Sequence, residues 1–299
     1  MRLQKIDTSA NVVTHFPDVE TFLAAESIPV GILSINEQGI PIDILNSDVG
    51  ADVTIVFFHG AIEPTHNLPV LSGQGISGGL IANRIFISDP SLYLTDKLAL
   101  AWFAGNSKQP LQKLLPQVIG RIIRQHGAQR VIFFGGSGGG YASMYYSSVT
   151  PGSLAIAFNP QTKVTRYINR SVRAFATHAF GISEDEYDPI AEIPNTPVLD
   201  LCAVYGQPVD NTVLYIQNTN DTFHIERHME PFLAVNHPDN KLHVMMDSWA
   251  PGHTPPPKTI LAGFLARMTS PEPWEESIPD VIREFSEEPS SEVPISSNV

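Results

Sequence analysis

The stretch Val131-Ile132-Phe133-Phe134-Gly135-Gly136-Ser137-Gly138-Gly139 joins four apolar, β-forming residues to a glycine-rich turn that carries one serine. A short continuous apolar run of this kind is typical of a strand buried on both faces of a mostly parallel sheet. The residues after the turn, from Tyr141 to Ser148, are predicted to continue as a helix that ends before Thr150-Pro151-Gly152. The serine therefore lies in a tight connection between a strand and a helix, which predicts an α/β fold.

The turn around Ser137 has the Gly-x-Ser-x-Gly form of a nucleophile elbow, with Gly135 and Gly139 two positions away on either side. Glycine is needed there because a Cβ atom would clash with neighbouring backbone in so tight a turn. A flexible linker has no reason to lie between a strand and a helix, and a phosphate-binding loop would continue with Gly-Lys-Ser/Thr. We therefore predict that Ser137 is the nucleophile of a serine hydrolase.

Strands and helices alternate along most of the chain. The segments 30–35 and 40–45 flank Asn36-Glu37-Gln38-Gly39 and predict an antiparallel hairpin. The alternation predicts a mainly parallel central sheet with helices on both faces. Further strands are expected at 53–58, 84–88, 154–158, 213–218 and 242–246, and helices at 111–126 and 260–268.

Two regions depart from this alternation. Residues 161–212 are less regular, and they predict either a cap over the site or an ordinary crossover with long loops. The tail 271–299 contains five prolines, eight acids and one arginine, so it is expected to be a solvated, poorly ordered extension of a hydrolase domain at 1–270.

Composition narrows the classes of partner. The tail carries −7 of the net charge of −13, and the remainder lacks the basic surface that nucleic-acid binding needs. Cys202 is the only cysteine, so no intramolecular disulfide can form. The first residues lack the apolar run of a signal peptide, and no uninterrupted apolar stretch approaches 18 residues. The sequence predicts a cytoplasmic protein without a membrane span, a cofactor or a nucleic-acid partner.

A serine nucleophile needs N–H donors for the oxyanion that forms when it attacks an ester or amide. One expected donor is the N–H of Gly138, which follows the serine at the start of its helix. The other is expected in His59-Gly60-Ala61, the turn after the strand at 53–58, where Ala61 is the best candidate. His59 itself is expected to pack beneath the site without a catalytic role.

Asp221 is the favoured triad acid because Asn218-Thr219-Asn220-Asp221 directly follows the strand at 213–218. A carboxylate at the carboxyl end of such a strand points into the catalytic crevice, where it can orient an imidazole. Asp200, Asp210 and Asp247 remain alternatives. A purely structural role for Asp221, in capping a turn, also remains open.

The favoured base is His253, in the loop Ala250-Pro251-Gly252-His253-Thr254 before the closing helix. Its place after Ser137 and Asp221 matches the Ser…Asp…His order of this fold class. His224 and His228 form an i, i+4 pair that could bind a metal. Glu226 lies one place too late for a metalloprotease motif, so a packed or surface pair is favoured and no metal site is predicted.

The whole arrangement resembles the α/β-hydrolase superfamily over roughly residues 30 to 268. The resemblance implies a Ser137–His253–Asp221 triad and an acyl-enzyme route. One departure is the oxyanion turn, which reads His-Gly-Ala where many esterases have His-Gly-Gly-Gly. The matching stretches are Phe57-Phe58-His59-Gly60-Ala61, Phe134-Gly135-Gly136-Ser137-Gly138-Gly139, Asn220-Asp221 and Gly252-His253.

A looser similarity links the chain to bacterial hydrolases associated with cell-surface glycan assembly and accessory secretion. It implies a small acyl group, such as acetyl on a sugar. The stretches that carry it are Ser88-Asp89-Pro90-Ser91-Leu92, Leu98-Ala99-Leu100-Ala101-Trp102-Phe103-Ala104-Gly105-Asn106 and Asn159-Pro160-Gln161-Thr162.

Three functions remain in view. The leading hypothesis is hydrolysis of a carboxylic ester, either of a small molecule or of a glycan. Acyl transfer to a sugar or another alcohol would use the same triad, and a catalytically silent scaffold would need none of these residues. Trp102, Tyr141 and Phe180 are candidates for lining an acyl or sugar pocket, with burial in the core as the alternative for each.

Overall fold

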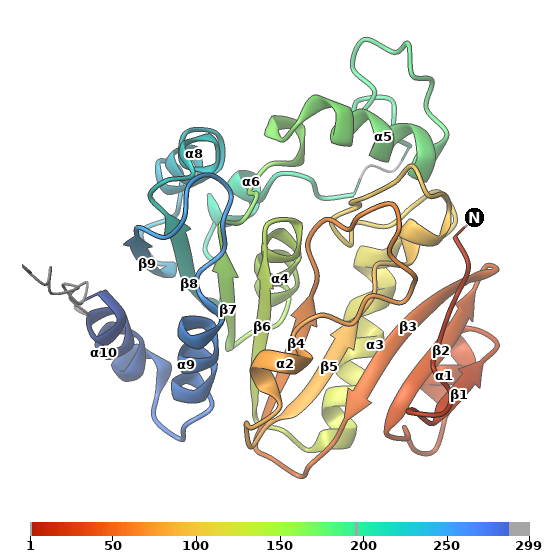
Figure 1. Cartoon of the computed structure of the whole chain (residues 1–299), viewed down its shortest axis with the longest axis horizontal. Coiled ribbons are helices and arrows are strands. Elements are labelled where there is room, and N and C mark those ends of the chain that lie inside the picture. Colours follow the sequence, from red (N-terminus) through yellow and green to blue (C-terminus); the bar gives the residue numbers. More distant parts are fainter. Residues whose placement is uncertain (1, 195–196, 287–299) are drawn as a thin grey trace, which may run out of the picture.

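The computed structural model describes residues 2–194 and 197–286. In these residues one nine-stranded sheet has the order β1-β2-β3-β5-β4-β6-β7-β8-β9 (Figure 1). The strands are β1 (Val13–Phe16), β2 (Gly31–Glu37), β3 (Ile40–Ser47), β4 (Val53–Phe58), β5 (Asn83–Ile87), β6 (Arg130–Gly136), β7 (Ser153–Phe158), β8 (Asn211–Asn218) and β9 (Lys241–Asp247).

The centre of the sheet is parallel, as the sequence predicts. β4 pairs with β5 and β6, and β6 to β9 follow one another in parallel. β4 and β8 are buried along their whole length, which explains why neither strand alternates apolar with exposed polar residues. β2 and β3 form the expected antiparallel hairpin, and β3 also pairs antiparallel with β5. The predicted α/β architecture with a mostly parallel sheet is therefore confirmed.

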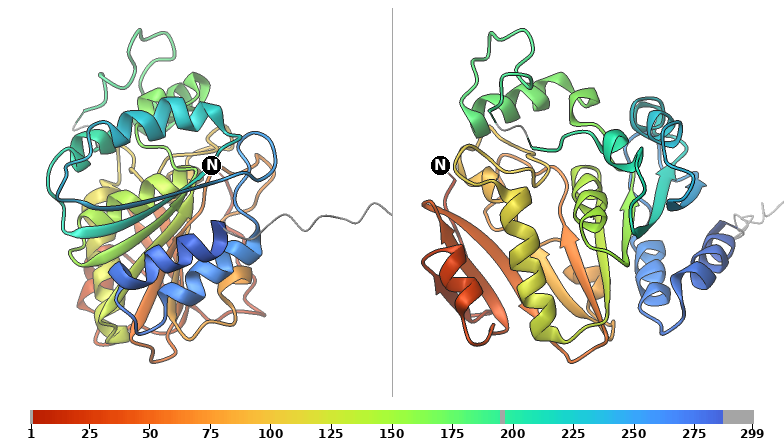
Figure 2. Two further views of the ribbon diagram at one scale, coloured as in Figure 1. Left: turned by 90° about the vertical axis from the view of Figure 1, so that its left-hand side faces the viewer. Right: turned by 180° about the vertical axis from the view of Figure 1, so that it is seen from behind.

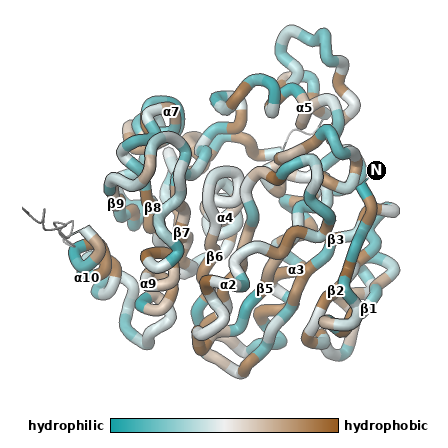
Figure 3. The backbone as a smooth tube through the Cα atoms, viewed as in Figure 1, coloured by the Kyte–Doolittle hydropathy of each residue, from teal (hydrophilic) through white to brown (hydrophobic). Residues whose placement is uncertain are grey.

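Helices cover both faces of the sheet (Figure 2). Helices α1, α3 and α4 contribute to one hydrophobic core, and α9 and α10 contribute to a second core on the opposite face. Figure 3 shows the apolar segments of the strands between them. The helices are α1 (Val19–Ala24), α2 (Gln74–Ser77), α3 (Leu111–His126), α4 (Gly138–Ser148), α5 (Asn169–Phe180), α6 (Leu201–Tyr205), α7 (Thr222–His224), α8 (Glu230–Leu233), α9 (Lys258–Met268) and α10 (Trp274–Ser286).

Helix α10 corrects the expectation of a poorly ordered tail that begins at residue 271. Trp274, Ile278 and Val281 are spaced on one helical face, and all three are buried in the core that α9 also lines. The acidic residues of this helix therefore lie on a folded element. The rest of the tail, residues 287–299, lies outside the described residues.

The described residues of the segment 161–212 include α5 and α6. Figure 1 shows α5 beyond the carboxyl ends of the parallel strands. Phe175 of α5 packs edge-to-face on Trp102, which fastens the helix to the body of the fold. Among the described residues, no helix is both long enough and apolar enough to cross a membrane.

Candidate active site

Ser137 occupies a strained backbone position at the end of β6. Its φ is 55° and its ψ is −121°, a conformation that residues with a Cβ rarely adopt. Glycine is required around it, because a Cβ on Gly139 would lie 2.4 Å from the carbonyl oxygen of Phe58. A Cβ on Gly135 would lie 2.4 Å from the carbonyl oxygen of Gly139. The close approach of α4 to the end of β4 therefore explains the glycines of the predicted elbow.

The turn after β4 lies against this elbow. A Cβ on Gly60 would lie 3.3 Å from the carbonyl oxygen of Gly136 and 3.5 Å from the Cβ of Ser137. Ala61 lines the same cavity as Ser137. Gly138 is the first residue of α4, so its N–H belongs to the unpaired N-terminal turn of that helix. Both expected oxyanion donors thus belong to backbone that adjoins the serine.

His59 packs beneath the turn, as expected from the sequence. Its Nδ1 lies 2.7 Å from the carbonyl oxygen of Gly60, and its Nε2 accepts the N–H of Asp89 at 3.1 Å. Burial lowers the pKa of His59 to about 4, so the ring is neutral at pH 7. Both ring nitrogens have backbone partners, so His59 stabilises the turn.

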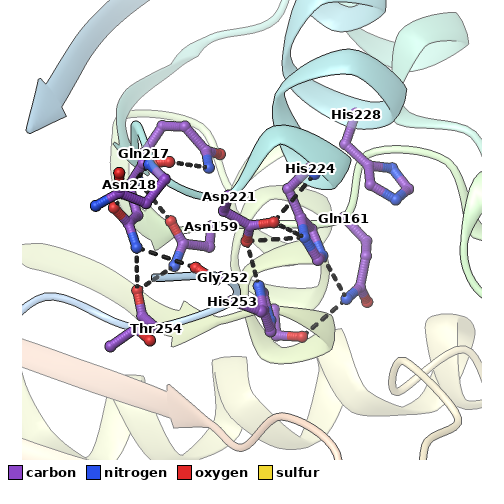
Figure 4. A network of polar contacts seen from close by, with 12 residues as sticks. Asn159, Gln161, Gln217, Asn218, Asp221, His224, His228, Gly252, His253 and Thr254 are labelled. Atoms are coloured by element: carbon purple, nitrogen blue, oxygen red, sulfur yellow. Dashed lines mark hydrogen bonds and ion pairs between the residues drawn. The ribbon is translucent and has the colours of Figure 1, made fainter. Parts of the chain in front are cut away.

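Asp221 holds two histidines (Figure 4). Its Oδ2 lies 2.5 Å from Nδ1 of His253, and both of its carboxylate oxygens lie 2.9 Å from Nδ1 of His224. The two imidazole rings are stacked, with centroids 3.9 Å apart and an angle of 12° between their planes. A carboxylate only accepts hydrogen bonds, so each ring carries a proton on Nδ1 and leaves Nε2 as its free base.

Asp221 also accepts the backbone N–H of His224 and so caps the start of α7. Asp221 therefore both caps α7 and binds the imidazole of His253, contacts that belong to the two roles that the sequence left as alternatives. Burial by itself raises the pKa of the Asp221 carboxyl, but the hydrogen bonds from His224 and His253 outweigh it and hold that pKa well below its usual range. Asp221 is therefore ionised at neutral pH.

Gln161 connects the serine to this pair. Its amide nitrogen lies 2.8 Å from Oγ of Ser137 and 3.3 Å from Nε2 of His224. The indole N–H of Trp102 donates to its amide oxygen at 2.8 Å, and an indole can only donate, which determines the orientation of the amide. Gln161 therefore donates to both Ser137 and His224, and the lone pair of His224 Nε2 is already in use.

Burial lowers the pKa of His224, and the neighbouring His253 lowers it further against the opposing effect of Asp221. Only 3% of the His224 side chain is exposed, compared with 37% for His253. His253 lines the cavity that contains Ser137. Of the two imidazoles, His253 is thus the one that lines the serine's cavity, and within residues 2–194 and 197–286 its Nε2 has no hydrogen-bond partner.

The loop that carries His253 is fastened by two buried asparagines. The side-chain amide of Asn218 donates to the carbonyl oxygens of Ala250, Gly252 and Thr254 at 2.9 to 3.2 Å. Asn159 donates to the same oxygen of Thr254 at 2.8 Å and accepts the N–H of Asn218. Figure 4 shows these contacts around the loop. A segment without regular secondary structure is thus held in one position by the ends of β7 and β8.

A cavity of about 510 Å³ opens beside the serine. Ser137, Ala61 and His253 line it together, and Tyr167 contributes from the segment that follows β7. Three residues that the sequence places far apart, and assigns to the nucleophile, the oxyanion turn and the base, are therefore brought to one hollow.

The three residues proposed to line a substrate pocket are placed elsewhere, which corrects that expectation. Trp102 and Tyr141 are fully buried, and their polar atoms bind Gln161 and the carbonyl oxygen of Val198. Phe180 lines a different hollow, beside α3. Trp102 nevertheless affects the site through Gln161.

The other aspartates considered for the triad have partners outside the cavity of Ser137, and so does His228 of the histidine pair. Asp200 caps α6 and pairs with Lys163 at 2.6 Å, while Asp247 accepts the N–H of Ser248.

A π-helical turn (Ile225–Met229) follows His224. His228 points its Nδ1 at the N–H of Thr162. Asp221, His224 and His253 offer three possible metal-ligating atoms within 4.8 Å, yet the Nδ1 protons bound to the carboxylate already satisfy this cluster.

Sequence reasoning missed Gln161 and the part that His224 plays. The sequence presents His224 only as half of a pair with His228. It presents Gln161 only within Asn159-Pro160-Gln161-Thr162, which carries the looser similarity. The available signal was that this short polar stretch directly follows β7, at the same sheet edge as Ser137.

No protein-family model matches the chain, and no curated protein sequence matches it. The fold does match solved structures. The capsule O-acetyltransferase of Neisseria meningitidis serogroup A, in complex with caged gadolinium, is 14% identical with a TM-score of 0.55, over 83% of this chain and 93% of that one.

Two further matches have the same low identity of 14%. The acylaminoacyl peptidase of Pyrococcus horikoshii has a TM-score of 0.51, over 78% of this chain and 38% of its own. A glycosylation-associated protein (Gap123) complex from Streptococcus agalactiae has a TM-score of 0.52, over 77% of this chain and 44% of the matched one. These similarities confirm the α/β-hydrolase fold. At this low sequence identity they are evidence for the fold and not for a particular function.

Proposed function

We propose that the protein is a serine hydrolase that cleaves a carboxylic ester through an acyl-enzyme, with Ser137 as nucleophile, His253 as base and Asp221 as the acid that orients it. One observation supports this most strongly: Ser137, Ala61 and His253 line one cavity, and His253 is held by the ionised Asp221 at 2.5 Å. An ester of a glycan, with acetyl as one such acyl group, is a substrate that the looser similarity favours.

In the proposed reaction, Nε2 of His253 removes the proton of Ser137 as Oγ attacks the ester carbonyl carbon. The N–H groups of Gly138 and Ala61 stabilise the oxyanion of the tetrahedral intermediate. Asp221 stabilises the imidazolium of His253, which then protonates the departing alcohol. Water, deprotonated by the same imidazole, attacks the acyl-enzyme and releases the acid, and Ser137 recovers its proton.

Acyl transfer is a second candidate function, because a match with the same overall fold is an O-acetyltransferase. In that reaction a sugar or other alcohol would replace water as the attacking group. The first half of the reaction and its residues would be the same, and the difference would be how far water is kept from the acyl-enzyme.

The proposal is tested with a p-nitrophenyl ester and the variant Ser137→Ala. We expect the variant to lose hydrolysis. Ser148→Ala is the matched control, since Ser148 lies on the same helix and its hydroxyl donates only to the carbonyl oxygen of Tyr145. Product analysis with and without an added alcohol separates hydrolysis from transfer. Hydrolysis unchanged in Ser137→Ala would refute the mechanism.

A further inference from the structure

The cavity beside Ser137 extends along an apolar wall. This wall belongs to the hydrophobic core on the α9 face of the sheet, and α2 and α9 lie on either side of it. The cavity therefore runs from the reactive hydroxyl into apolar surroundings. The wall consists of Phe57, Phe134, Phe158, Ile76 and Leu261.

The register of the strands sets the length of this wall. Phe134 precedes Ser137 by three residues on β6, and Phe57 is its partner on β4. At a rise of about 3.3 Å per residue, the wall reaches roughly 10 Å from the serine. An extended hydrocarbon chain, with bonds of about 1.5 Å, advances roughly 1.3 Å per bond, so the wall matches roughly eight carbons.

Backbone packed against the rings keeps this wall in place. A Cβ on Gly73 would lie 2.4 Å from the ring of Phe57, and one on Gly136 would lie 2.0 Å from the ring of Phe158. Phe57 also stacks on Phe86, with centroids 4.7 Å apart. Backbone thus lies close against the rings of Phe57 and Phe158, which limits how far they can turn away from the cavity and favours a straight chain over a branched one.

We infer that this cavity binds the acyl part of the substrate, and that the acyl group is a straight aliphatic chain of about six to eight carbons. The inference rests on the proposed function and names the substrate class of the same site. Acetyl, the acyl group that the looser similarity implies, would leave most of the 510 Å³ without contacts, so the cavity favours a longer acyl chain over acetyl.

The test is the hydrolysis of p-nitrophenyl esters from acetate to palmitate by the wild type and by Ile76→Trp. Ile76 is half-buried at the edge of the cavity, so a tryptophan there can fill the cavity without entering the sealed core. Leu80→Trp is the control, because Leu80 is half-buried against the same core but does not line the cavity.

In the wild type we expect kcat/KM to rise by up to about fourfold per added methylene as far as six to eight carbons, and then to stop rising. Ile76→Trp should lower the ratio of the octanoate value to the acetate value at least tenfold, while Leu80→Trp keeps the wild-type profile. A best substrate of two carbons, or an unchanged profile in Ile76→Trp, would overturn the acyl-chain assignment. Labelling of Ser137 by a fluorophosphonate is measured in parallel. If Ser137 is labelled, such a result overturns only the acyl-chain assignment, whereas absence of labelling would indicate that the proposed function is wrong.

The chain of hydrogen bonds Trp102–Gln161–His224–Asp221 carries a second, independent inference. All four side chains are buried, and every link has one defined donor and one defined acceptor. The donation from Gln161 to Oγ of Ser137 directs the hydroxyl proton of the serine away from the amide.

We propose that Gln161 and His224 are positioning residues: His224 holds the carboxylate of Asp221 in the plane that His253 needs, and Gln161 holds Ser137 Oγ. This too rests on the proposed function. Neither residue accepts a proton in the reaction, because His224 Nε2 is occupied by the amide of Gln161.

The test compares His224→Leu with the conservative His224→Asn, whose amide N–H can reach Asp221 as Nδ1 does. We expect Leu to lower kcat about 10- to 100-fold, the cost of a hydrogen bond to a charged group, with KM within twofold. Asn should restore most of kcat. Rates are normalised to the fraction of Ser137 that a fluorophosphonate titrates, so misfolded protein does not count. Equal impairment in both variants, or an unchanged kcat in the leucine variant, would overturn this role.

Discussion

The contact between the start of α4 and the end of β4 offers a demanding prediction through Gly139→Ala. The added Cβ would lie 2.4 Å from the carbonyl oxygen of Phe58 and 2.8 Å from that of His59. Real Cβ contacts essentially never fall below 3.0 Å, so the first distance must open by at least 0.6 Å. Both neighbours are backbone atoms, which cannot give way by changing rotamer.

Opening this contact moves the turn that carries Ala61 away from Ser137. Overpacking of this kind costs roughly 1–3 kcal/mol of the free energy of unfolding. A displacement near 1 Å at a catalytic site can cost about 10²-fold in rate. We therefore expect Gly139→Ala to remain folded, to lose about 1–3 kcal/mol in urea unfolding, and to lose about 10²-fold in kcat towards a p-nitrophenyl ester.

Gly79→Ala is the matched control, since a Cβ there meets nothing within 4 Å and its φ is ordinary. It should unfold and turn over like the wild type. If Gly139→Ala instead kept both its stability and its kcat within twofold of the control, α4 would not abut β4 as described, and the elbow geometry would be wrong.

Three further predictions concern titratable groups in and near the site. His253→Ala should lower kcat about 10²- to 10⁴-fold in ester hydrolysis, and an unimpaired variant would reassign the base. Asp221→Asn should lower kcat about 10⁴-fold, because a neutral side chain no longer stabilises the imidazolium; activity within tenfold of the wild type would argue against an ionised Asp221. Burial lowers the pKa of His228 to about 3, below its value of 6.5 in the unfolded chain, so its contribution to stability is complete above pH 6.5 and is lost as the pH falls. His228→Gln should therefore lose roughly 3 kcal/mol less than the wild type between pH 7 and pH 4, and parallel stability curves would contradict this.

The parts of the fold that the sequence predicts well are those with local causes. β4 has the predicted bounds because six β-forming residues, five of them apolar, are followed by His59-Gly60. α3 has the predicted bounds because its apolar stripe ends at Gly127. The nucleophile elbow was predictable because its glycines avoid a steric clash that arises within one turn. Helix α10 was not expected, because acidic and proline residues obscured the spacing of Trp274, Ile278 and Val281.

For the site, the order of residues along the chain could predict only which residues were the best candidates. Ser137, Asp221 and His253 could be ranked by their positions after strands. Gln161 and His224 could not, because their proposed roles depend on side chains that meet across the sheet edge and on the indole of Trp102, which determines the orientation of one amide. The prediction that Trp102, Tyr141 and Phe180 line a substrate pocket was wrong because residue type alone does not distinguish a pocket wall from the core.

The central claim is that Ser137 is an activated nucleophile, and reaction of the folded protein with a fluorophosphonate probe tests it most directly. We predict one covalent adduct per chain, mapped to Ser137 by mass spectrometry and absent from both Ser137→Ala and the unfolded wild type. A folded wild-type protein that forms no adduct, as a catalytically silent scaffold would, contradicts the account.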